Sequence, residues 1–380
     1  MIAFLIENID VRGGTHKQFL KLLDYASSQN EPFFIVTRRV DLDKTYTGFS
    51  QYKDRIRILE DEPKGSRSIL AQYYRRYKMR RKLARLISDA DIVNVHDNGF
   101  EELLPAFKGK RTVWQINDLY YAFRVGVCND FKDSRHLRRL RNIVLKSLKN
   151  VDEITVNVSK NATRVRDKLN RNAKVLYCGI EPIGISHDAA ESFRRFENRR
   201  INLLSSGVWF PYRNYETQVE VVRLLSEQDY DVRLKIIGST QYDEAYLEKI
   251  LAMISDYGLT DRIEICGMID EDRFRELHSE SDIFMFINVD QSWGLAVFEA
   301  MSCGLPVIVS NSVGATEILN DGVDSLFVDP RSPEEIAEVI KNLINDRKVY
   351  EMIAGNAKVF HKKYTWDDAY SSKMLNLLKK

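Results

Sequence analysis

The sequence predicts an α/β protein that contains two parallel-sheet domains. Short apolar runs alternate with amphipathic stretches along the chain, which is the pattern of repeated βαβ units. This alternation starts twice, at residues 2–6 and again at residues 201–205. The chain has 380 residues, which is enough for two domains that each bury a core of their own.

We expect four segments from this alternation. The first domain should span residues 1–183 and the second residues 201–364. Residues 184–200 lose the periodicity and are polar and charged, so they are expected to form the linker. Residues 365–380 are expected to form a terminal amphipathic helix. In open parallel sheets, ligands bind beyond the carboxyl ends of the strands, so the loops there hold the candidate site residues.

The composition narrows the class of protein. Hydrophobic residues make up 44% of the chain and charged residues 29%, which excludes a disordered chain. The longest apolar runs have about six residues, whereas a membrane-spanning helix needs ~20. The first apolar run meets Glu7, so we expect a first strand and not a signal peptide. The four cysteines are widely spaced, which favours cytoplasmic thiols over zinc or redox pairs: Cys128, Cys178, Cys266 and Cys303.

The first domain offers candidate ligand contacts after three predicted strands. The strand over residues 2–6 is followed by a glycine turn that contains Gly14 and opens a helix. The need for a sharp turn and a contact with a phosphate explain the glycines of this turn about equally well. His96 follows one later strand, and Asn117 and Asp118 follow another. Side chains directly after parallel strands are expected at the edge of the sheet where ligands bind.

Two predicted helices, residues 70–87 and 132–149, are strongly basic. The first has no acidic residue, and it carries three tyrosines, Tyr73, Tyr74 and Tyr77. Its basic residues are Arg75, Arg76, Lys78, Arg80, Arg81, Lys82 and Arg85. Such helices can rest on an anionic membrane surface. A solvated charged face explains them equally well at this point. Nucleic acid is not expected, because no nucleic-acid-binding module accompanies the basic residues.

The most informative stretch of the second domain runs from residue 282 to residue 306. A short apolar strand is followed by a polar turn that ends at Gly294, and Leu295 begins a helix. The first amides of a helix have no partner within the helix, and the helix dipole favours negative charge there. The stretch therefore predicts an anion pocket, with Glu299 one helical turn further along.

The residues Gln291, Gly294, Leu295 and Glu299, followed by Pro306, resemble the signature of the retaining glycosyltransferases of family four, the glycosyl transferases group 1. The family pattern has a glutamate at each end, and here Gln291 occupies the first of these two positions. The resemblance implies a GT-B fold, in which two Rossmann-like parallel-sheet domains face a cleft and a C-terminal helix crosses back to the first domain. The first domain would then bind the acceptor and the second the donor.

The resemblance also implies roles for single residues. The implied donor-binding residues are Gly14, Arg213, Met268, Gly294, Leu295 and Glu299. Catalytic contacts are implied for His96, Gln291 and Glu299, and acceptor or sugar contacts for Asn117 and Asp118. Four positions depart from the family pattern: Gln291, Val208 in place of a first basic residue, Asn117 where histidine is usual, and Cys178 where asparagine is more common. No metal ion and no cofactor are implied.

The resulting expectation is a retaining, metal-independent glycosyltransferase that uses a nucleoside-diphosphate sugar, with UDP or GDP as the nucleotide. Its acceptor would be a glycan, a lipid-linked molecule or another hydroxyl compound in cell-surface polysaccharide or glycolipid assembly. We expect a cytoplasmic protein, with the inner face of the membrane as a candidate peripheral site through residues 70–87 and 132–149. Two alternatives stay open: a non-catalytic nucleotide-sugar binding subunit, and a peripheral membrane-binding protein.

Overall fold

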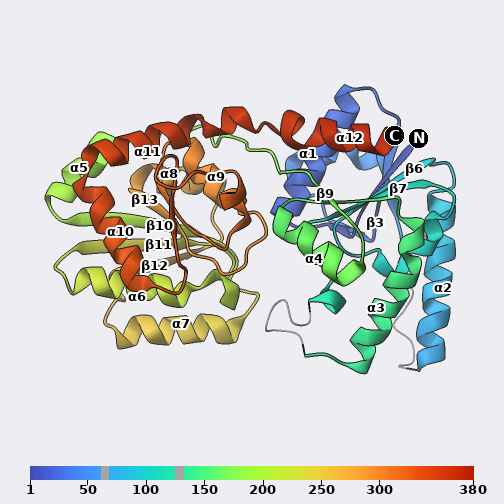
Figure 1. Cartoon of the computed structure of the whole chain (residues 1–380), viewed down its shortest axis with the longest axis horizontal. Helices are drawn as coiled ribbons and strands as arrows, with labels where there is room; N and C mark the ends of the chain where they lie inside the picture. Colours follow the sequence, from blue (N-terminus) through green and yellow to red (C-terminus); the bar gives the residue numbers. More distant parts are fainter. Residues whose placement is uncertain (61–67, 125–131) are drawn as a thin grey trace. The chain divides into compact units, whose positions relative to one another are not determined.

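The computed structural model describes residues 1–60, 68–124 and 132–380, which form two compact units (Figure 1). The first unit is Met1–Gly179 together with Trp366–Lys380, and the second is Ile180–Thr365. Each unit is an α/β domain with a parallel main sheet. The predicted fold class, with two Rossmann-like domains, is therefore confirmed.

The first unit contains a seven-stranded sheet in the order β5-β3-β1-β6-β7-β8-β9. Its strands are β1 (Ile2–Ile6), β3 (Phe33–Thr37), β5 (Ile56–Ile58), β6 (Ile92–His96), β7 (Arg111–Ile116), β8 (Glu153–Val156) and β9 (Lys174–Val175). A small separate pair is formed by β2 (Asn8–Ile9) and β4 (Arg39–Val40). Its longer helices are α1 (Gly14–Ser28), α2 (Ile69–Leu86), α3 (Arg135–Ser147) and α4 (Ser159–Leu169). The short helices are η1 (Thr47–Arg55), η2 (Glu101–Phe107), η3 (Tyr121–Phe123) and η4 (Leu148–Asn150).

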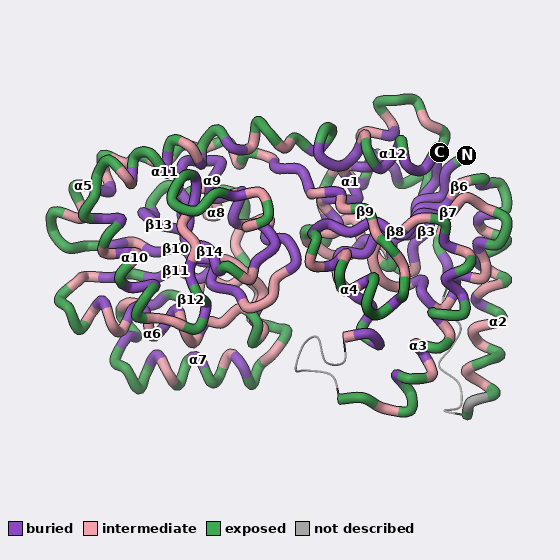
Figure 2. The backbone as a smooth tube through the Cα atoms, viewed as in Figure 1, coloured by how far each residue is buried: buried purple, intermediate pink, exposed green. Residues whose placement is uncertain are grey.

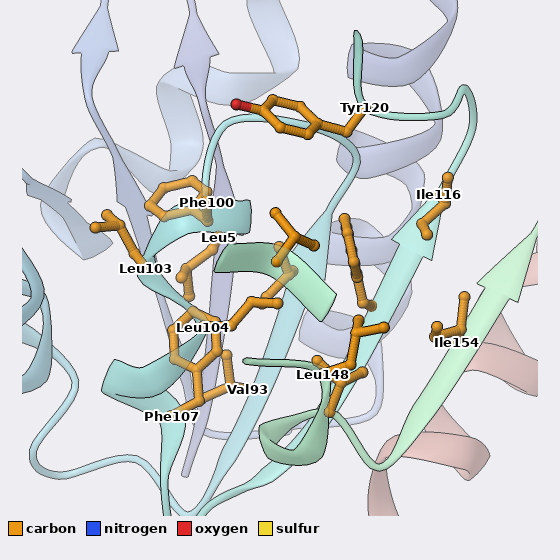
Figure 3. Close-up of a cluster of buried hydrophobic side chains, with 14 of the residues drawn as sticks. Leu5, Val93, Phe100, Leu103, Leu104, Phe107, Ile116, Tyr120, Leu148 and Ile154 are labelled. Atoms are coloured by element: carbon orange, nitrogen blue, oxygen red, sulfur yellow. The ribbon is translucent and has the colours of Figure 1, made fainter. Parts of the chain in front are cut away.

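Both faces of this sheet are covered. The strands β1 and β3 are buried along their whole length (Figure 2), which is why they read as continuous apolar runs in the sequence. Figure 3 shows part of the core, where Phe100 and Phe107 from the region of η2 gather around Leu5 and Val93 from two neighbouring strands. The first unit therefore has its own hydrophobic core.

The end of the chain returns to the first unit, as expected. A π-helical turn, η8 (Asp367–Ser371), and the helix α12 (Ser372–Lys379) pack on α1, β6 and β7. Gly179 and Trp366 meet so closely that a Cβ atom on Gly179 would lie 2.2 Å from the Trp366 Cα. Glycine is thus required where the chain leaves the first unit and comes back to it.

The second unit contains a six-stranded sheet in the order β12-β11-β10-β13-β14-β15. Its strands are β10 (Arg200–Ser206), β11 (Asp231–Ile237), β12 (Ile263–Gly267), β13 (Ile283–Phe286), β14 (Val307–Ser310) and β15 (Leu326–Val328). Its longer helices are α5 (Ala189–Glu197), α6 (Tyr215–Ser226), α7 (Glu244–Asp256), α8 (Glu271–Glu280), α9 (Leu295–Ser302), α10 (Pro333–Asn345) and α11 (Arg347–Phe360). The short helices are η5 (Pro211–Arg213), η6 (Gly314–Glu317) and η7 (His361–Lys363). Figure 1 shows α6 and α7 on one side of this sheet and α8 and α9 on the other.

The prediction that residues 184–200 form a linker was wrong. These residues belong to the second unit, and Asp188 caps the helix α5 within them. Arg195 of this helix forms an ion pair with the buried Asp282, with 2.5 Å between Nη2 and Oδ1. The phenyl ring of Phe193 packs on Tyr350, with ring centroids 5.2 Å apart. The apolar face of this nine-residue helix has few members, such as Phe193 and Phe196, so its helical pattern is short and lies among polar and charged residues.

No helix in the described part of the chain is both long and apolar enough to cross a membrane. Three of the cysteines carry free thiols, namely Cys178, Cys266 and Cys303, while Cys128 lies outside the described residues.

Candidate functional site

The candidate site of the second unit lies where the loops after β10, β13 and β14 are bound together. The amide of Val289 donates to the carbonyl of Tyr212 at 2.7 Å, which joins the first two loops. The amide of Gly314 donates to the carbonyl of Gln291 at 3.1 Å, which joins the third. Since β10 and β13 are neighbours at the point where the strand order reverses, this edge is the usual ligand position in such a sheet.

Gly294 shapes the start of α9. Its φ of +99° lies in the left-handed region, and a Cβ atom there would lie 2.9 Å from the Phe286 ring and 3.2 Å from Val313. Only glycine fits this position without displacing its neighbours. The helix that starts at Leu295 has no acidic residue in its first turn, so its amide end is a suitable position for an anion.

Arg213 lies beside the same aromatic ring. Its guanidinium carbon is 5.8 Å from the centroid of Phe286, the ring that also limits the space at Gly294. The side-chain carbonyl oxygen of Asn288 accepts a hydrogen bond from Nη1 of Arg213 at 2.9 Å, in the side-chain orientation that gives both polar atoms of Asn288 a partner. The guanidinium also packs on Gly207, where a Cβ atom would lie 2.8 Å from the Arg213 Cζ. The fold thus gathers a fixed cation and a helix N-terminus around Phe286.

The other predicted residues of this unit lie further out on the same edge or beside it. Gln291 is partly buried in the turn between β13 and α9, and its carbonyl is used to hold the loop after β14. Glu299 lies in α9. Burial lowers the pKa of His278 in α8, and the negative charge of Glu299 offsets only part of this lowering. Met268 follows β12 and is 73% exposed. Glu299 therefore lies in α9, and Met268 lies in the loop between β12 and α8.

In the first unit, Gly14 is exposed at the N-terminus of α1. No side chain caps this helix, and its first turn has no acidic residue. A Cβ atom on Gly13 would meet only the His16 ring, at 3.6 Å, so space alone does not require glycine there. The amide end of α1 is thus a second place where an anion could bind.

His96 is fully buried, where the sequence suggested a side chain at the ligand edge. Its ring lies 5.0 Å from Phe19 of α1 and 6.5 Å from Tyr370 of the returning C-terminal segment. Burial lowers the pKa of His96 to about 3, so the ring is neutral at physiological pH. The physical reason for the difference is that α1 and the last residues of the chain cover this end of β6.

Asn117 is also buried, and it holds a hydrogen-bond network together. Its Nδ2 atom donates to the hydroxyl of Thr15 at 3.2 Å and to Oε1 of Gln18 at 2.8 Å. Its Oδ1 atom accepts from Nε2 of Gln115 at 2.9 Å, and its carbonyl accepts from the side chain of Asn161. These bonds fix the end of β7 to the start of α1. The geometry gives Asn117 a positioning role beneath the loop that carries Asp118.

We expect Asn117→Leu to destabilise the first unit by about 2–4 kcal/mol. Leucine has a similar volume but leaves Gln18 and Gln115 with buried polar atoms that have lost their partner. Denaturant unfolding measures the loss. Asn150→Leu is the matched control, because the hydrogen bond that the structure shows for the Asn150 side chain goes to the nearby carbonyl of Ser147. Equal stability of the two variants would contradict the network.

Asp97 is a site residue that the sequence did not single out. Its Oδ1 atom accepts from the amides of Asn117 and Asp118, at 3.1 Å and 3.4 Å, and its Oδ2 atom accepts from the Thr15 hydroxyl at 3.4 Å. Burial, together with the charge of Asp118, raises the pKa of Asp97 to about 7. Its position directly after β6 was the available signal. Asp97 and Asn117 together place Asp118 and the start of α1 at one edge.

Metal binding has no candidate among the residues that the structure describes: no three histidine, cysteine or carboxylate side chains are grouped to hold an ion.

Comparison with known proteins agrees with this architecture. A family model described as glycosyl transferases group 1 matches residues 187–360, which lie within the second unit. An uncharacterized glycosyltransferase of Methanocaldococcus jannaschii is 28% identical over 203 residues, covering 51% of this chain and 51% of the relative. Sucrose synthase 1 of Hordeum vulgare is 30% identical over 145 residues, covering 36% of this chain and 18% of that protein. The matches thus span about half, or less, of the length of these curated relatives.

A solved structure resembles the whole chain. The crystal structure of HepE from Anabaena, in complex with UDP and glucose, aligns with a TM-score of 0.77 at 15% identity. The alignment covers 100% of this chain and 99% of that one. At this low identity the likeness shows the fold alone.

Proposed function

We propose that this chain belongs to the glycosyl transferases group 1 and that it transfers a sugar from a nucleoside-diphosphate sugar to a hydroxyl acceptor. The observation that carries the proposal is the gathering of Arg213 and the amide end of α9 around Phe286. A guanidinium and free helix amides are the groups that suit a diphosphate. They stand at the edge of the sheet where the strand order reverses.

The proposed chemistry follows from charge. When the bond between the sugar and the diphosphate breaks, the diphosphate gains negative charge and the sugar becomes oxocarbenium-like. Donors fixed in advance stabilise that charge without having to reorganise. Arg213 and the amides at Gly294 and Leu295 would supply these donors. Glu299 would accept hydrogen bonds from the ribose hydroxyls, and Gln291 would contact the sugar as a neutral amide that both donates and accepts.

The finer parts of the proposal have different support. UDP is the first nucleotide to test, because the HepE complex contains UDP and glucose. Retention of configuration, a glycan or lipid-linked acceptor, and a role in cell-surface polysaccharide or glycolipid assembly rest on the resemblance of the motif around Glu299. The contact of Asp118 with an acceptor or sugar is part of the same proposal.

Nucleotide binding tests the donor site directly. UDP at about 100 times its Kd should stabilise the native protein by ~2.7 kcal/mol and raise the thermal midpoint by roughly 5 °C or more. Glu299→Ala should reduce this shift, because the ribose hydroxyls lose their acceptor. No shift with UDP, GDP or their sugars would overturn the proposed donor class. A shift without transfer or donor hydrolysis would instead favour the non-catalytic binding subunit.

A second proposal concerns the membrane and rests on the exposed face of α2. The three tyrosines of this helix, Tyr73, Tyr74 and Tyr77, are 63%, 59% and 49% exposed. Lys78 lies over the Tyr74 ring and Arg81 over the Tyr77 ring. Aromatic rings and basic side chains on one face are typical of helices that lie on anionic lipid. The helix α3 contributes less, because two of its arginines pair with Asp133.

Vesicle flotation tests this surface. The protein should float with phosphatidylglycerol vesicles at low salt and separate from them at high salt, because the attraction is electrostatic. Replacing Tyr73 and Tyr77 with alanine should weaken the association, whereas Tyr257→Ala in the second unit should not. A protein that stays unbound at low salt would remove the membrane proposal and leave the transfer reaction untouched.

A further inference from the structure

Asn214 directly follows Arg213, at the start of the helix α6. Its φ of +56° lies in the left-handed region, which asparagine adopts more readily than most residues that have a Cβ atom. An asparagine that precedes a helix usually accepts a hydrogen bond from one of the first amides of that helix. In the part of the chain that the structure describes, the Asn214 side chain accepts no such bond from α6. Its hydrogen bonds serve another purpose.

The Asn214 side chain joins three loops at the carboxyl edge of the sheet. Its Nδ2 atom donates to the carbonyl of Ile287, directly after β13, at 3.1 Å. The same atom donates to the carbonyl of Pro330, after β15, at 2.6 Å, so both of its N–H groups are used. Its Oδ1 atom accepts from the hydroxyl of Thr217 at 2.9 Å. Since Ile287 and Pro330 lie 73 and 116 residues further along the chain, this side chain fixes the loop after β10 against two distant loops.

Asn288, the residue after Ile287, holds Arg213 at two points. Asn288 is 2% exposed, and its side-chain oxygen accepts from Nη1 of Arg213 at 2.9 Å. In the same orientation, its side-chain nitrogen donates to the main-chain carbonyl of Arg213 at 3.3 Å. The guanidinium is therefore fixed to Asn288, and Asn214 fixes the neighbouring Ile287. We call Asn214 and Asn288 together the asparagine clamp.

The asparagine clamp changes what Arg213 loses when an anion binds. An arginine side chain on a surface has many rotamers, and it gives up this freedom when it binds a ligand. A guanidinium that the fold already holds binds with a smaller loss of entropy. Its donors also stay aimed at one place, where they can stabilise developing charge without reorganising. Arg213 is partly exposed, so the held guanidinium is still accessible to a ligand.

We propose that the asparagine clamp positions Arg213 for the diphosphate of the donor. This inference rests on the proposed function, because it takes the anion at Arg213 to be the diphosphate of a nucleotide sugar. Both N–H groups of Asn214 are bound to carbonyls, and both polar atoms of the Asn288 side chain are bound to Arg213. The two asparagines are thus positioning residues, which act on the diphosphate through Arg213 and do not touch it.

A double-mutant cycle tests the proposal, with inorganic pyrophosphate and UDP as probes and isothermal titration calorimetry as the measurement. Asn214→Gly keeps the left-handed backbone, which glycine adopts freely, and removes only the side chain. It should weaken binding of both probes roughly fivefold, whereas Arg213→Ala should weaken it roughly 10- to 100-fold, as expected for a hydrogen bond to a charged group. In the Arg213→Ala background, Asn214→Gly should have no further effect, because the two residues act as one unit.

Two further variants make the cycle specific. Asn170→Gly is the matched control, since Asn170 also has a left-handed backbone, with a φ of +51°, but lies at the end of α4 in the first unit. Its variant should bind both probes like the wild type. Asn288→Ala gives a second cycle that does not depend on the folding of Asn214→Gly. It removes the other half of the asparagine clamp and should weaken binding only while Arg213 is present.

The outcomes distinguish this inference from the proposed function. Losses that multiply in the double variants would overturn the asparagine clamp, because independent losses indicate residues that only stabilise the fold. UDP binding that Arg213→Ala weakens, and that neither asparagine variant changes, would overturn the clamp and keep the donor site. Pyrophosphate binding with the expected non-additive losses, in a protein that binds neither UDP nor GDP, would support the clamp and contradict the nucleotide-sugar donor. Unchanged binding of both probes in Arg213→Ala would overturn both.

Discussion

Replacing Arg213 with alanine is expected to lower kcat/KM for sugar transfer by about 10³-fold, because a fixed donor next to the developing diphosphate charge is lost. The fold should survive. The Arg213 side chain is partly exposed and its hydrogen bond to Asn288 contributes only ~1 kcal/mol, so the thermal midpoint should stay within a few degrees of the wild type. Steady-state kinetics with a UDP sugar, together with thermal unfolding, measures both effects.

Two controls show whether the effect belongs to the position or only to the charge. Arg213→Lys keeps the charge but loses the planar fork, so it should recover part of the activity. Arg223→Ala removes an arginine of the neighbouring helix α6 that is paired with Glu220 and Glu227, and it should leave kinetics unchanged. Wild-type rates in Arg213→Ala would show that the diphosphate binds elsewhere, and the donor site would have to be sought at another edge.

The elements around Arg213 and Gly294 could be predicted because their signals are local. The β-branched and aromatic residues of β13 mark a buried strand, and a glycine before an apolar helix marks the turn between them. The close contact between Arg213 and Phe286 could not be predicted, because it joins loops that lie far apart in the chain. Sequence reasoning identified the two loops separately, and the strand order brings them together.

His96 shows where a local pattern stops being informative. A residue at the end of a parallel strand is usually near the ligand edge, but the ring of His96 is covered by Phe19 and by Tyr370. Tyr370 belongs to a segment that reaches this place only after the chain has completed the second unit. Nothing near His96 in the sequence indicates that cover. The same applies to Asn117, whose partners Thr15 and Gln18 come from the first helix of the chain.

The largest effect on both binding and stability is expected for Gly294→Ala. The left-handed backbone costs an alanine about 1–2 kcal/mol by itself. The added Cβ atom would also lie 2.9 Å from the Phe286 ring, so either the ring or the start of α9 must shift. A shift of either one separates the amides of α9 from Arg213, and the variant should lose the thermal stabilisation by UDP altogether.

Gly322→Ala separates the backbone cost from the cost of the contact. Gly322 also has a positive φ, of +71°, but a Cβ atom there would meet nothing within 4 Å. Its variant should lose stability only by the backbone term and should bind UDP normally. Gly294→Ala should unfold at a lower temperature than Gly322→Ala and show no UDP shift. If the two variants had the same midpoint and the same UDP shift, the packing of Gly294 on Phe286 would have no part in anion binding, and the amide end of α9 would no longer support the donor site.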